Sequence, residues 1–347
     1  MNTDLWTYLQ NSKKPVVLYG TGNGADKILD ELERRGVAVQ GVFASSGFVR
    51  NRSFRGFQVE SYEACRERLG DMIVLMCFGS TRPEVWENIS RISSEQEFYA
   101  PDVPVYGKNL FDDVFYQAHQ DEINRVRELL ADDLSRLTFD CTIKNKLTGD
   151  LAYLRECQVS GDEADALTVP GEGATFLDLG AYNGDTVLRY TNMYPQISSV
   201  IAVEPDGRNF RKLNENTSDI SGITYVNALI SDHVGETTME VNKGRGVHEG
   251  AGVTVQCTTI DELLREHIGT DTPIFIKMDV EGNELLALEG GCEVINKCRP
   301  IMNIACYHRS EDIWTLPLKV HATRPDYKIY MRHLPSVPGW DTQFYFI

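Results

Sequence analysis

The stretch FLDLGAYNGDT, residues 176–186, decides how we expect the second half of the chain to fold. An apolar run ends at Asp178, the glycines Gly180 and Gly184 follow, and a helix-like segment comes next. A strand that opens through a glycine-rich turn into a helix is typical of a nucleotide-binding α/β sheet. The next apolar run, SSVIAVEP, ends at Glu204, twenty residues after Gly184. A carboxylate at this point can accept both hydroxyls of a ribose, so the pattern predicts a ligand that contains a nucleoside.

Acidic residues beside this turn indicate the charge of the ligand. Asp178 precedes the first glycine, and Asp185 follows the last. Two carboxylates would repel a pyrophosphate, whereas S-adenosylmethionine carries a sulfonium and an ammonium beside its nucleoside. We therefore expect S-adenosylmethionine rather than NAD. Glu204 could instead cap the following helix, NFRKLNEN, but Asp206 is better placed for that role.

Strand-like runs alternate with helix-like runs along the 347 residues, which predicts an α/β architecture in two domains. The second series of strands comprises ATFLDLG, SSVIAVEP, GITYVNALI, PIFIKMDV and PIMNIACYH, and DYKIYMRHL and TQFYFI look like two paired strands. We expect a Rossmann-like N-terminal domain at residues 1–112, a helical connector at 113–170 and the second α/β domain at 171–347.

The connector is expected to be helical because of its apolar spacing. The segment DEINRVRELLADDLSRL places Ile123, Val126, Leu129 and Leu130 on one face of a helix. A polar, turn-rich stretch, VSGDEADALTVPGEG, then leads into the second domain.

A first glycine-rich turn, VVLYGTGNGADK at residues 16–27, raises the possibility of a second nucleotide site. Gly20, Gly22 and Ala25 match the G-x-G-x-x-A form of the dinucleotide fingerprint. However, residues 43–46 read Phe-Ala-Ser-Ser and lack the acid that would hold a ribose. Three arginines that follow could favour a phosphate or form a solvated loop: Arg50, Arg52 and Arg55. The turn is either a scaffold or a secondary recognition site.

Composition limits the range of partners and locations. The formal net charge is −17, which argues against a nucleic-acid partner because phosphate binding depends on clustered Lys and Arg. We see neither a signal peptide nor an apolar run long enough to span a membrane. The eight cysteines form no C-x-x-C pair, so we expect reduced thiols in a cytoplasmic protein.

Over roughly residues 171–347, the sequence resembles the FkbM family of S-adenosylmethionine-dependent methyltransferases. The resemblance rests on FLDLGAYNGDT, VIAVEPDGRNFRKL, TTIDELL and above all FIKMDVEGNELLALEGG, with its K-x-D-V-E-G-x-E run. It implies a class I methyltransferase fold, with a mostly parallel seven-stranded sheet, helices on both faces and the cofactor across the carboxyl ends of the strands. Family association with sugar and polysaccharide genes implies an O-methyltransferase that acts on a sugar hydroxyl in polysaccharide or glycoconjugate biosynthesis.

The resemblance also implies roles for residues near the cofactor. Residues expected at its methionine end are Asp178, Gly180, Asn183 and Asp185. Glu204 would hold the ribose. Adenine would lie against Asn227 and possibly against Asp261, which are the least constrained positions because the path of VNKGRGVHEGAG, which looks like an inserted hairpin, cannot be placed.

The chemistry is expected at the ends of two further strands. The fourth strand would bring Asp279 and Glu281 beside the transferred methyl, with Lys277 paired to one of the acids. Glu281 could instead merely begin the next helix. His308 at the end of the fifth strand is our candidate base, with Asp279 as the alternative, although a histidine there could be a plain surface residue.

The remaining expectations concern ligands and alternatives. Asp279, Glu281 and His308 could hold a divalent cation, but no metal site is predicted because nothing in the sequence fixes their convergence. The acceptor would be a small molecule or a glycan, and a homo-oligomer is possible. The alternative function is a two-site enzyme whose N-terminal domain binds NAD or a nucleotide sugar. A non-catalytic cofactor sensor is a third possibility.

Overall fold

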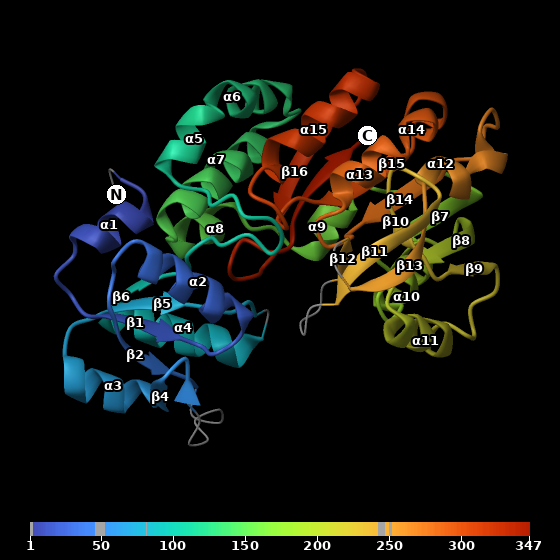
Figure 1. The fold of residues 1–347 in the computed structure, drawn as a ribbon. Helices are drawn as coiled ribbons and strands as arrows, with labels where there is room; N and C mark the ends of the chain where they lie inside the picture. Colours follow the sequence, from blue (N-terminus) through green and yellow to red (C-terminus); the bar gives the residue numbers. More distant parts are fainter. Residues whose placement is uncertain (1–2, 46–52, 81, 242–246, 250–251) are drawn as a thin grey trace.

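The computed structural model describes residues 3–45, 53–80, 82–241, 247–249 and 252–347. Two α/β units lie on either side of a group of helices that connects them (Figure 1). Within these ranges, no helix is both long enough and apolar enough to cross a membrane.

The N-terminal unit contains a six-stranded sheet in the order β3-β4-β2-β1-β5-β6, parallel except for the β3–β4 pair. Its strands are β1 (Val16–Tyr19), β2 (Val39–Phe43), β3 (Ser53–Phe54), β4 (Phe57–Glu60), β5 (Ile73–Met76) and β6 (Glu97–Tyr99). Helices α1 (Leu5–Asn11) and α2 (Asn23–Arg34) pack on one face, and α3 (Tyr62–Leu69) and α4 (Pro83–Glu95) on the other. The parallel order β4-β2-β1-β5-β6 follows the winding of a Rossmann-like sheet.

The second unit contains the expected seven-stranded sheet, in the order β16-β17-β15-β14-β7-β8-β9. Strand β17 runs antiparallel to both neighbours, and the other adjacent pairs are parallel. Its strands are β7 (Ala174–Leu179), β8 (Ile197–Val203), β9 (Ile223–Val226), β14 (Ile274–Met278), β15 (Ile301–Ala305), β16 (Ile329–His333) and β17 (Thr342–Phe346). All six residues of β7 are buried, as expected for a central parallel strand that is covered on both faces. This is the class I methyltransferase sheet that the sequence predicts.

Helices cover both faces of the second sheet (Figure 1). On one side lie α10 (Asp185–Met193) and α11 (Gly207–Asn216); on the other lie α13 (Glu284–Glu289), α14 (Cys292–Cys298) and α15 (Asp312–Thr323). A small sheet of β10 (Leu229–Ile230), β13 (Val253–Thr258), β11 (Gly235–Val241) and β12 (Val247–Glu249) is inserted before α12 (Ile260–Leu263). The inserted hairpin is present as the antiparallel β11–β12 pair, and its residues 242–246 and 250–251 lie outside the described ranges.

The connector consists of α5 (Asp113–Ala118), α6 (Gln120–Leu129), α7 (Asp133–Thr148), α8 (Leu151–Cys157) and α9 (Gly161–Asp165). The helical pattern expected over residues 121–137 is interrupted. Leu130 has extended backbone and forms a parallel bridge with Ile329, at the start of β16. Asp132 then caps α7, because its Oδ1 accepts the backbone N–H of Ser135 at 2.7 Å. The apolar periodicity concealed this break because Leu130 is buried in either conformation.

The connector shares a hydrophobic core with the second sheet. Ile123 and Val126 of α6 and Phe139 and Ile143 of α7 belong to the same cluster of buried side chains as Phe344 of β17. The connector therefore completes the core on the side of the sheet that carries its antiparallel edge.

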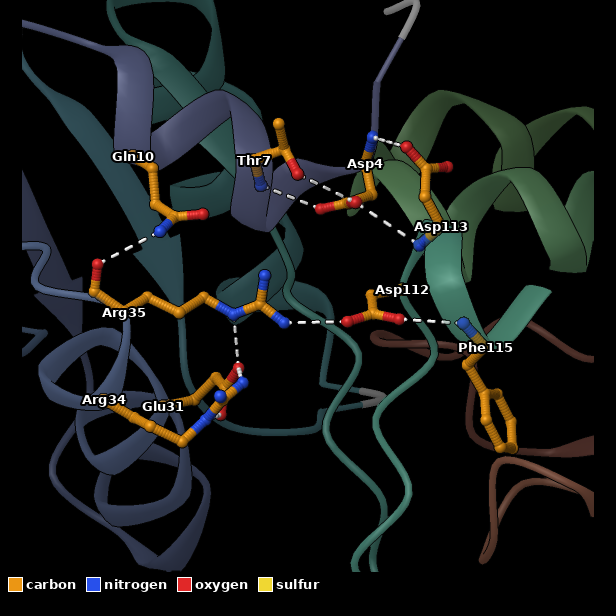
Figure 2. A network of polar contacts seen from close by, with 9 residues as sticks. All are labelled: Asp4, Thr7, Gln10, Glu31, Arg34, Arg35, Asp112, Asp113 and Phe115. Carbon is orange, nitrogen blue, oxygen red and sulfur yellow. Dashed lines mark hydrogen bonds and ion pairs between the residues drawn. The ribbon is translucent and has the colours of Figure 1, made fainter. Parts of the chain in front are cut away.

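A polar network joins the N-terminal unit to the connector (Figure 2). The backbone N–H of Asp4, the cap of α1, donates to Asp113 Oδ2 at 3.1 Å, and the N–H of Asp113 donates back to Asp4 Oδ2 at 3.3 Å. Beside them, Arg35 Nη2 donates to Oδ2 of Asp112, the cap of α5, at 2.8 Å. The first helices of the two regions are thus held together through their caps.

The ion pair between Asp132 and Arg332 provides a test of how the connector is fixed to the sheet. Arg332 is buried, and its Nη2 lies 2.7 Å from Asp132 Oδ2. Although partial burial opposes the shift, the hydrogen bonds from Arg332 lower the pKa of Asp132 from 3.8 to about 2. We expect Asp132→Asn to lower the free energy of unfolding by about 2 kcal/mol at pH 7, because the guanidinium is left buried without its carboxylate.

The contribution of this pair depends on pH in a defined direction. Because the folded-state pKa lies below the unfolded value, the stabilisation is complete above about pH 4 and is lost as the pH falls through about 2. Urea unfolding should therefore show a smaller difference between wild type and Asp132→Asn at pH 3 than at pH 7. Asp133→Asn is the control, since Asp133 is fully exposed and its loss should change stability by less than about 0.5 kcal/mol. Equal effects of the two variants would contradict the assignment.

Candidate active site

A cavity of about 920 Å³ lies where the carboxyl ends of both sheets face each other. The second sheet contributes Lys277 from within β14 and residues that follow its strands: Gly180, Tyr182, Asp185, Glu204, Asp279, Glu281, Tyr307 and His308. The N-terminal unit contributes residues after β1 and β5: Gly22, Asn23, Gly24, Lys27, Phe78 and Gly79. Residues 101–105 complete the wall. Parallel topology therefore brings these distant segments to one site.

Gly180 allows the turn after β7 to pass directly beside the loop after β14. Its φ is +83°, and a Cβ at this position would lie 1.9 Å from the carbonyl oxygen of Asp279. That carbonyl cannot move away freely, because the N–H of Asp279 donates to Leu179 O at 2.9 Å. Only glycine satisfies both the backbone conformation and the close approach.

Glu204 lies at the tip of β8 and faces the cavity while being only 5% exposed. Its Oε2 accepts the N–H of Tyr182 at 2.9 Å, and its Oε1 accepts the N–H of Asp206 at 2.9 Å. Burial raises the pKa of Glu204 to about 7, and the two backbone donors limit that rise. Asp206 rather than Glu204 caps α11, as the sequence suggests, so Glu204 remains available to a ligand.

Four residues expected near the cofactor lie behind the described cavity wall. Asp178 is fully buried. The side chain of Asn183 accepts the N–H of Asp185 at 3.3 Å. Asn227 Nδ2 donates to the carbonyls at the end of β8, at 2.8 and 3.1 Å, and the residues that follow it, 228–230, line the cavity instead. Asp261 accepts two backbone N–H groups at the start of α14, at 3.0 and 2.8 Å.

Lys277 lies between two carboxylates at the ends of neighbouring strands. Its Nζ is 3.8 Å from Asp178 Oδ1 and 3.8 Å from Asp279 Oδ2. Burial raises the pKa of Asp178 to about 6, and Lys277 counteracts the rise. Burial alone would lower the pKa of Lys277, but Asp279 and Asp178 together raise it, so the lysine remains charged. The sequence predicts one partner for Lys277, and the structure provides two.

His308 is surrounded by acidic side chains. Its Nε2 lies 3.3 Å from Asp279 Oδ1 and 3.5 Å from Glu281 Oε2, and its Nδ1 lies 2.9 Å from Glu284 Oε1. Glu281 has a φ of +56°, a conformation that side chains rarely adopt, and it does not cap α13. The loop after β14 therefore presents Glu281 to the cavity rather than to the helix that follows.

These neighbours determine which group can accept a proton. Burial alone would lower the pKa of His308, but Glu284, Asp279 and Glu281 raise it to about 10. Burial raises the pKa of Glu281, whereas Lys277 and His308 overcome burial and lower the pKa of Asp279. The three carboxylates therefore favour the imidazolium form of His308.

Tyr106, which precedes the helical connector, contacts the loops after β14 and β15. The N–H of Tyr106 donates to His308 O at 2.9 Å, and the Tyr106 ring packs against Gly282. The guanidinium of Arg309 lies 4.1 Å from the centre of the same ring, and its Nε donates to Gly282 O at 2.7 Å. Arg309 thus joins Tyr106 to the loop after β14.

Three features of the site were missed from the sequence. Glu284 belongs to the K-x-D-V-E-G-x-E run but was given no role, and the structure shows that it contacts His308. Residues 101–105 carry no motif. Trp340 lies in the loop between β16 and β17 and lines the cavity, 38% exposed, with its ring against Gly79 of the N-terminal unit. The sequence offers only a tryptophan in a turn-rich stretch, which does not distinguish a cavity residue from a surface residue.

The first glycine turn lines the same cavity but serves packing as well. A Cβ at Gly24 would lie 2.4 Å from Cys77 O, so this glycine allows α2 to approach the end of β5. Beside the end of β2, where a ribose would be held, the space lined by Tyr19 and Phe43 is about 50 Å³. Ligand pockets typically have about 300 Å³ or more, so this space does not accommodate a nucleoside.

The arginines considered for a phosphate give no support to a site there. Arg55 Nη2 pairs with Asp30 of α2 at 2.8 Å. Arg50 and Arg52 lie outside the described residues.

Comparison with known proteins identifies the second unit. Residues 178–327 match the family model described as the methyltransferase FkbM domain. The crystal structure of methyltransferase FkbM from Methylobacillus flagellatus KT is similar over 99% of this chain and 92% of that chain, with a TM-score of 0.73 and 20% sequence identity. At this identity, the likeness shows the fold alone, and it extends over both units. No curated protein sequence matches the chain.

More remote structures cover about half of the chain. Precorrin-6y C5,15-methyltransferase from Geobacter metallireducens GS-15 is 10% identical over 53% of this chain and 84% of that chain, with a TM-score of 0.34. A putative methyltransferase from Streptococcus mutans in complex with SAH is 8% identical over 55% of this chain and 99% of that chain, with a TM-score of 0.35. Likenesses at these TM-scores carry no functional weight.

The close approach at Gly180 can be tested with a matched pair of glycines. Gly180→Ala should unfold at a markedly lower temperature than wild type, because strain at positive φ is added to a collision with the backbone of Asp279. Gly173→Ala is the control, since Gly173 has a φ of +73° but open space around its Cβ position. We expect Gly173→Ala to lower the free energy of unfolding by about 1–2 kcal/mol, because only the strain of its backbone conformation is added. If thermal melts show the same loss for both variants, the contact with Asp279 does not constrain the site.

Proposed function

Because residues 178–327 form a methyltransferase FkbM domain, the chain is an S-adenosylmethionine-dependent methyltransferase, and we propose that it methylates a hydroxyl group of a sugar. The sugar would be part of a glycan or of a small glycoconjugate. The observation that carries the proposal is one continuous cavity, which contains Gly180 and Glu204 at one end and Asp279, Glu281 and His308 beside them. A volume of about 920 Å³ is at the upper end of the usual range for ligand pockets, so it can take a cofactor and a second molecule.

The cofactor is proposed to lie across the ends of β7, β8 and β14. Glu204 would accept the ribose hydroxyls, which its position at the tip of β8 and its buried carboxylate support. Gly180 and Asp185 would contact the methionine end, where Asp185 offsets its positive charge. Adenine would lie against residues 228–230, with Asn227 holding the end of β8 in place.

The acceptor is proposed to occupy the part of the cavity between the two units. Trp340 and Tyr307 offer ring faces that suit the apolar face of a sugar, and both line the cavity. Asp279 and Glu281 can accept hydrogen bonds from hydroxyl groups. The first glycine turn, at residues 22–24, would then contact a distal part of the acceptor, which makes it a recognition element rather than a separate cofactor site.

The reaction is an in-line displacement at the methyl carbon. The acceptor oxygen forms a bond to that carbon, the carbon–sulfur bond breaks, its electron pair stays on sulfur, and the hydroxyl proton leaves. The sequence makes His308 the first candidate to receive the proton, but its acidic neighbours raise its pKa to about 10 and so favour the form that already carries the proton. We propose Glu281 instead, because burial brings its pKa closer to neutrality, where a general base is most effective.

Two observations count against the alternative of a nucleotide-binding N-terminal domain. The acid that would hold a ribose is absent from residues 43–46, and the space beside β2 is about 50 Å³. A thermal-shift comparison of NAD, NADP and UDP-sugars with S-adenosylmethionine separates the two readings. A shift with NAD and none with S-adenosylmethionine would favour the alternative over the proposed function.

Replacing Glu204 tests the cofactor assignment. We expect Glu204→Ala to bind S-adenosylmethionine at least tenfold more weakly in calorimetry, because two charge-assisted hydrogen bonds to the ribose are lost. Glu215→Ala, which removes an exposed carboxylate from the next helix, should bind as wild type does. Unchanged affinity of Glu204→Ala for S-adenosylmethionine would contradict the assignment.

The acceptor class can be identified from the product. Incubation with methyl-labelled S-adenosylmethionine and a panel of sugars and oligosaccharides should yield a methyl ether, which resists mild base. Glu281→Gln should lower kcat at least a hundredfold without changing cofactor affinity, since it removes the proton acceptor. Glu289→Gln, at the exposed end of the same loop–helix segment, is the matched control and should retain activity. Label in a base-labile ester, or in an amide, would rule out the sugar hydroxyl.

A further inference from the structure

We propose that Asp279, Glu284 and His308 hold a divalent cation of the Mg²⁺ or Mn²⁺ type beside the cavity. Each residue offers one ligand atom, and the three atoms lie within 4.8 Å of one another. In a six-coordinate Mg²⁺ site, ligands on opposite sides of the ion are separated by twice the bond length, roughly 4.0–4.2 Å, so the three atoms need to move closer by a few tenths of an ångström. The three side chains can therefore reach one ion with small adjustments.

The unmet bonding of Glu284 is the second observation. Its side chain is fully buried, and Oε1 accepts the N–H of Val280 at 2.9 Å. Oε2 has no hydrogen-bond donor among the described residues. A buried carboxylate oxygen without a donor is costly, and a cation is one of the few partners that can satisfy it there.

The backbone holds these ligands in place before any ion binds. Glu284 begins α13 and is tied to the loop after β14 through Val280. The carbonyl of His308 is held by the N–H of Tyr106 at 2.9 Å, and His308 itself is 1% exposed. Two of the ligands therefore come from rigid, buried positions, which favours a defined site over loose association of an ion with surface acids.

The open side of the site faces the proposed acceptor. Asp279 and His308 line the cavity, whereas Glu284 lies behind them. Two carboxylates and one imidazole leave coordination positions for water or for oxygen atoms of a ligand. An ion here would bind a pair of neighbouring acceptor hydroxyls and lower the pKa of the one that is methylated, a role that rests on the proposed function. Glu281, 3.5 Å from His308 Nε2, would remain free to take the proton.

Metal binding can be measured independently of catalysis. Protein treated with EDTA and dialysed should bind one Mn²⁺ per chain, as followed by the electron paramagnetic resonance signal of free Mn²⁺, and Mg²⁺ should compete. Glu284→Gln should weaken Mn²⁺ binding at least tenfold, and Asp279→Asn should do the same. Glu289→Gln, an exposed acid on the same helix, should bind as wild type does.

The outcomes separate this inference from the proposed function. Circular dichroism checks that Glu284→Gln is folded, and Asp279→Asn, at a partly exposed position, provides a second variant if it is not. Absence of a Mn²⁺ site in the wild type, or wild-type affinity in folded Glu284→Gln and Asp279→Asn, would overturn the inference. Calorimetry with S-adenosylmethionine on the EDTA-treated protein tests the cofactor site separately, because Glu204 and Gly180 are not ligands of the ion.

Discussion

The site depends on Lys277, whose charge holds together two carboxylates at the ends of β7 and β14. Asp178 is fully buried, neither of its oxygens has a hydrogen-bond donor among the described residues, and Lys277 is 3.8 Å away. The parallel register aligns Lys277 directly with Asp178, so one lysine faces both Asp178 and Asp279. This positive charge offsets the repulsion between the buried Asp178 and the partly exposed Asp279, and so favours the close approach of the turn at Gly180 to the loop that begins at Asp279.

Around Lys277, different segments of the chain line the two sides of the cavity. The ends of β7 and β8 carry the residues that we propose for the cofactor, and the ends of β14 and β15 carry the acids and His308. The wall opposite them comes from the N-terminal unit and from residues 101–105, which are far away in sequence. The residues proposed for the cofactor therefore lie in the motifs that carry the resemblance, whereas the opposite wall combines the first glycine turn with residues 101–105, which carry no motif.

Much of the framework could be predicted from local patterns. Glycine turns and apolar runs predicted where the strands of the second sheet lie. The sequence also predicted that Asp206 rather than Glu204 caps the following helix, and Asp206 is the cap of α11. The break at Leu130 was hidden because burial, not helical geometry, fixes that residue. Asn227 and Asp261 were placed at the adenine by position in the chain, yet their side chains bind backbone groups. Glu284 and Trp340 could not be assigned because their roles arise from contacts between distant elements.

The contact between α6–α7 and the antiparallel edge of the second sheet bears on the order in which the protein is made. Synthesis from the N-terminus delivers the six strands of the first sheet within the first hundred residues, so that unit can begin to fold while the rest is still being translated. Leu130, in contrast, must wait for Ile329, nearly two hundred residues later, before its bridge can form. The apolar face of the connector therefore stays uncovered until α15 and the last two strands emerge.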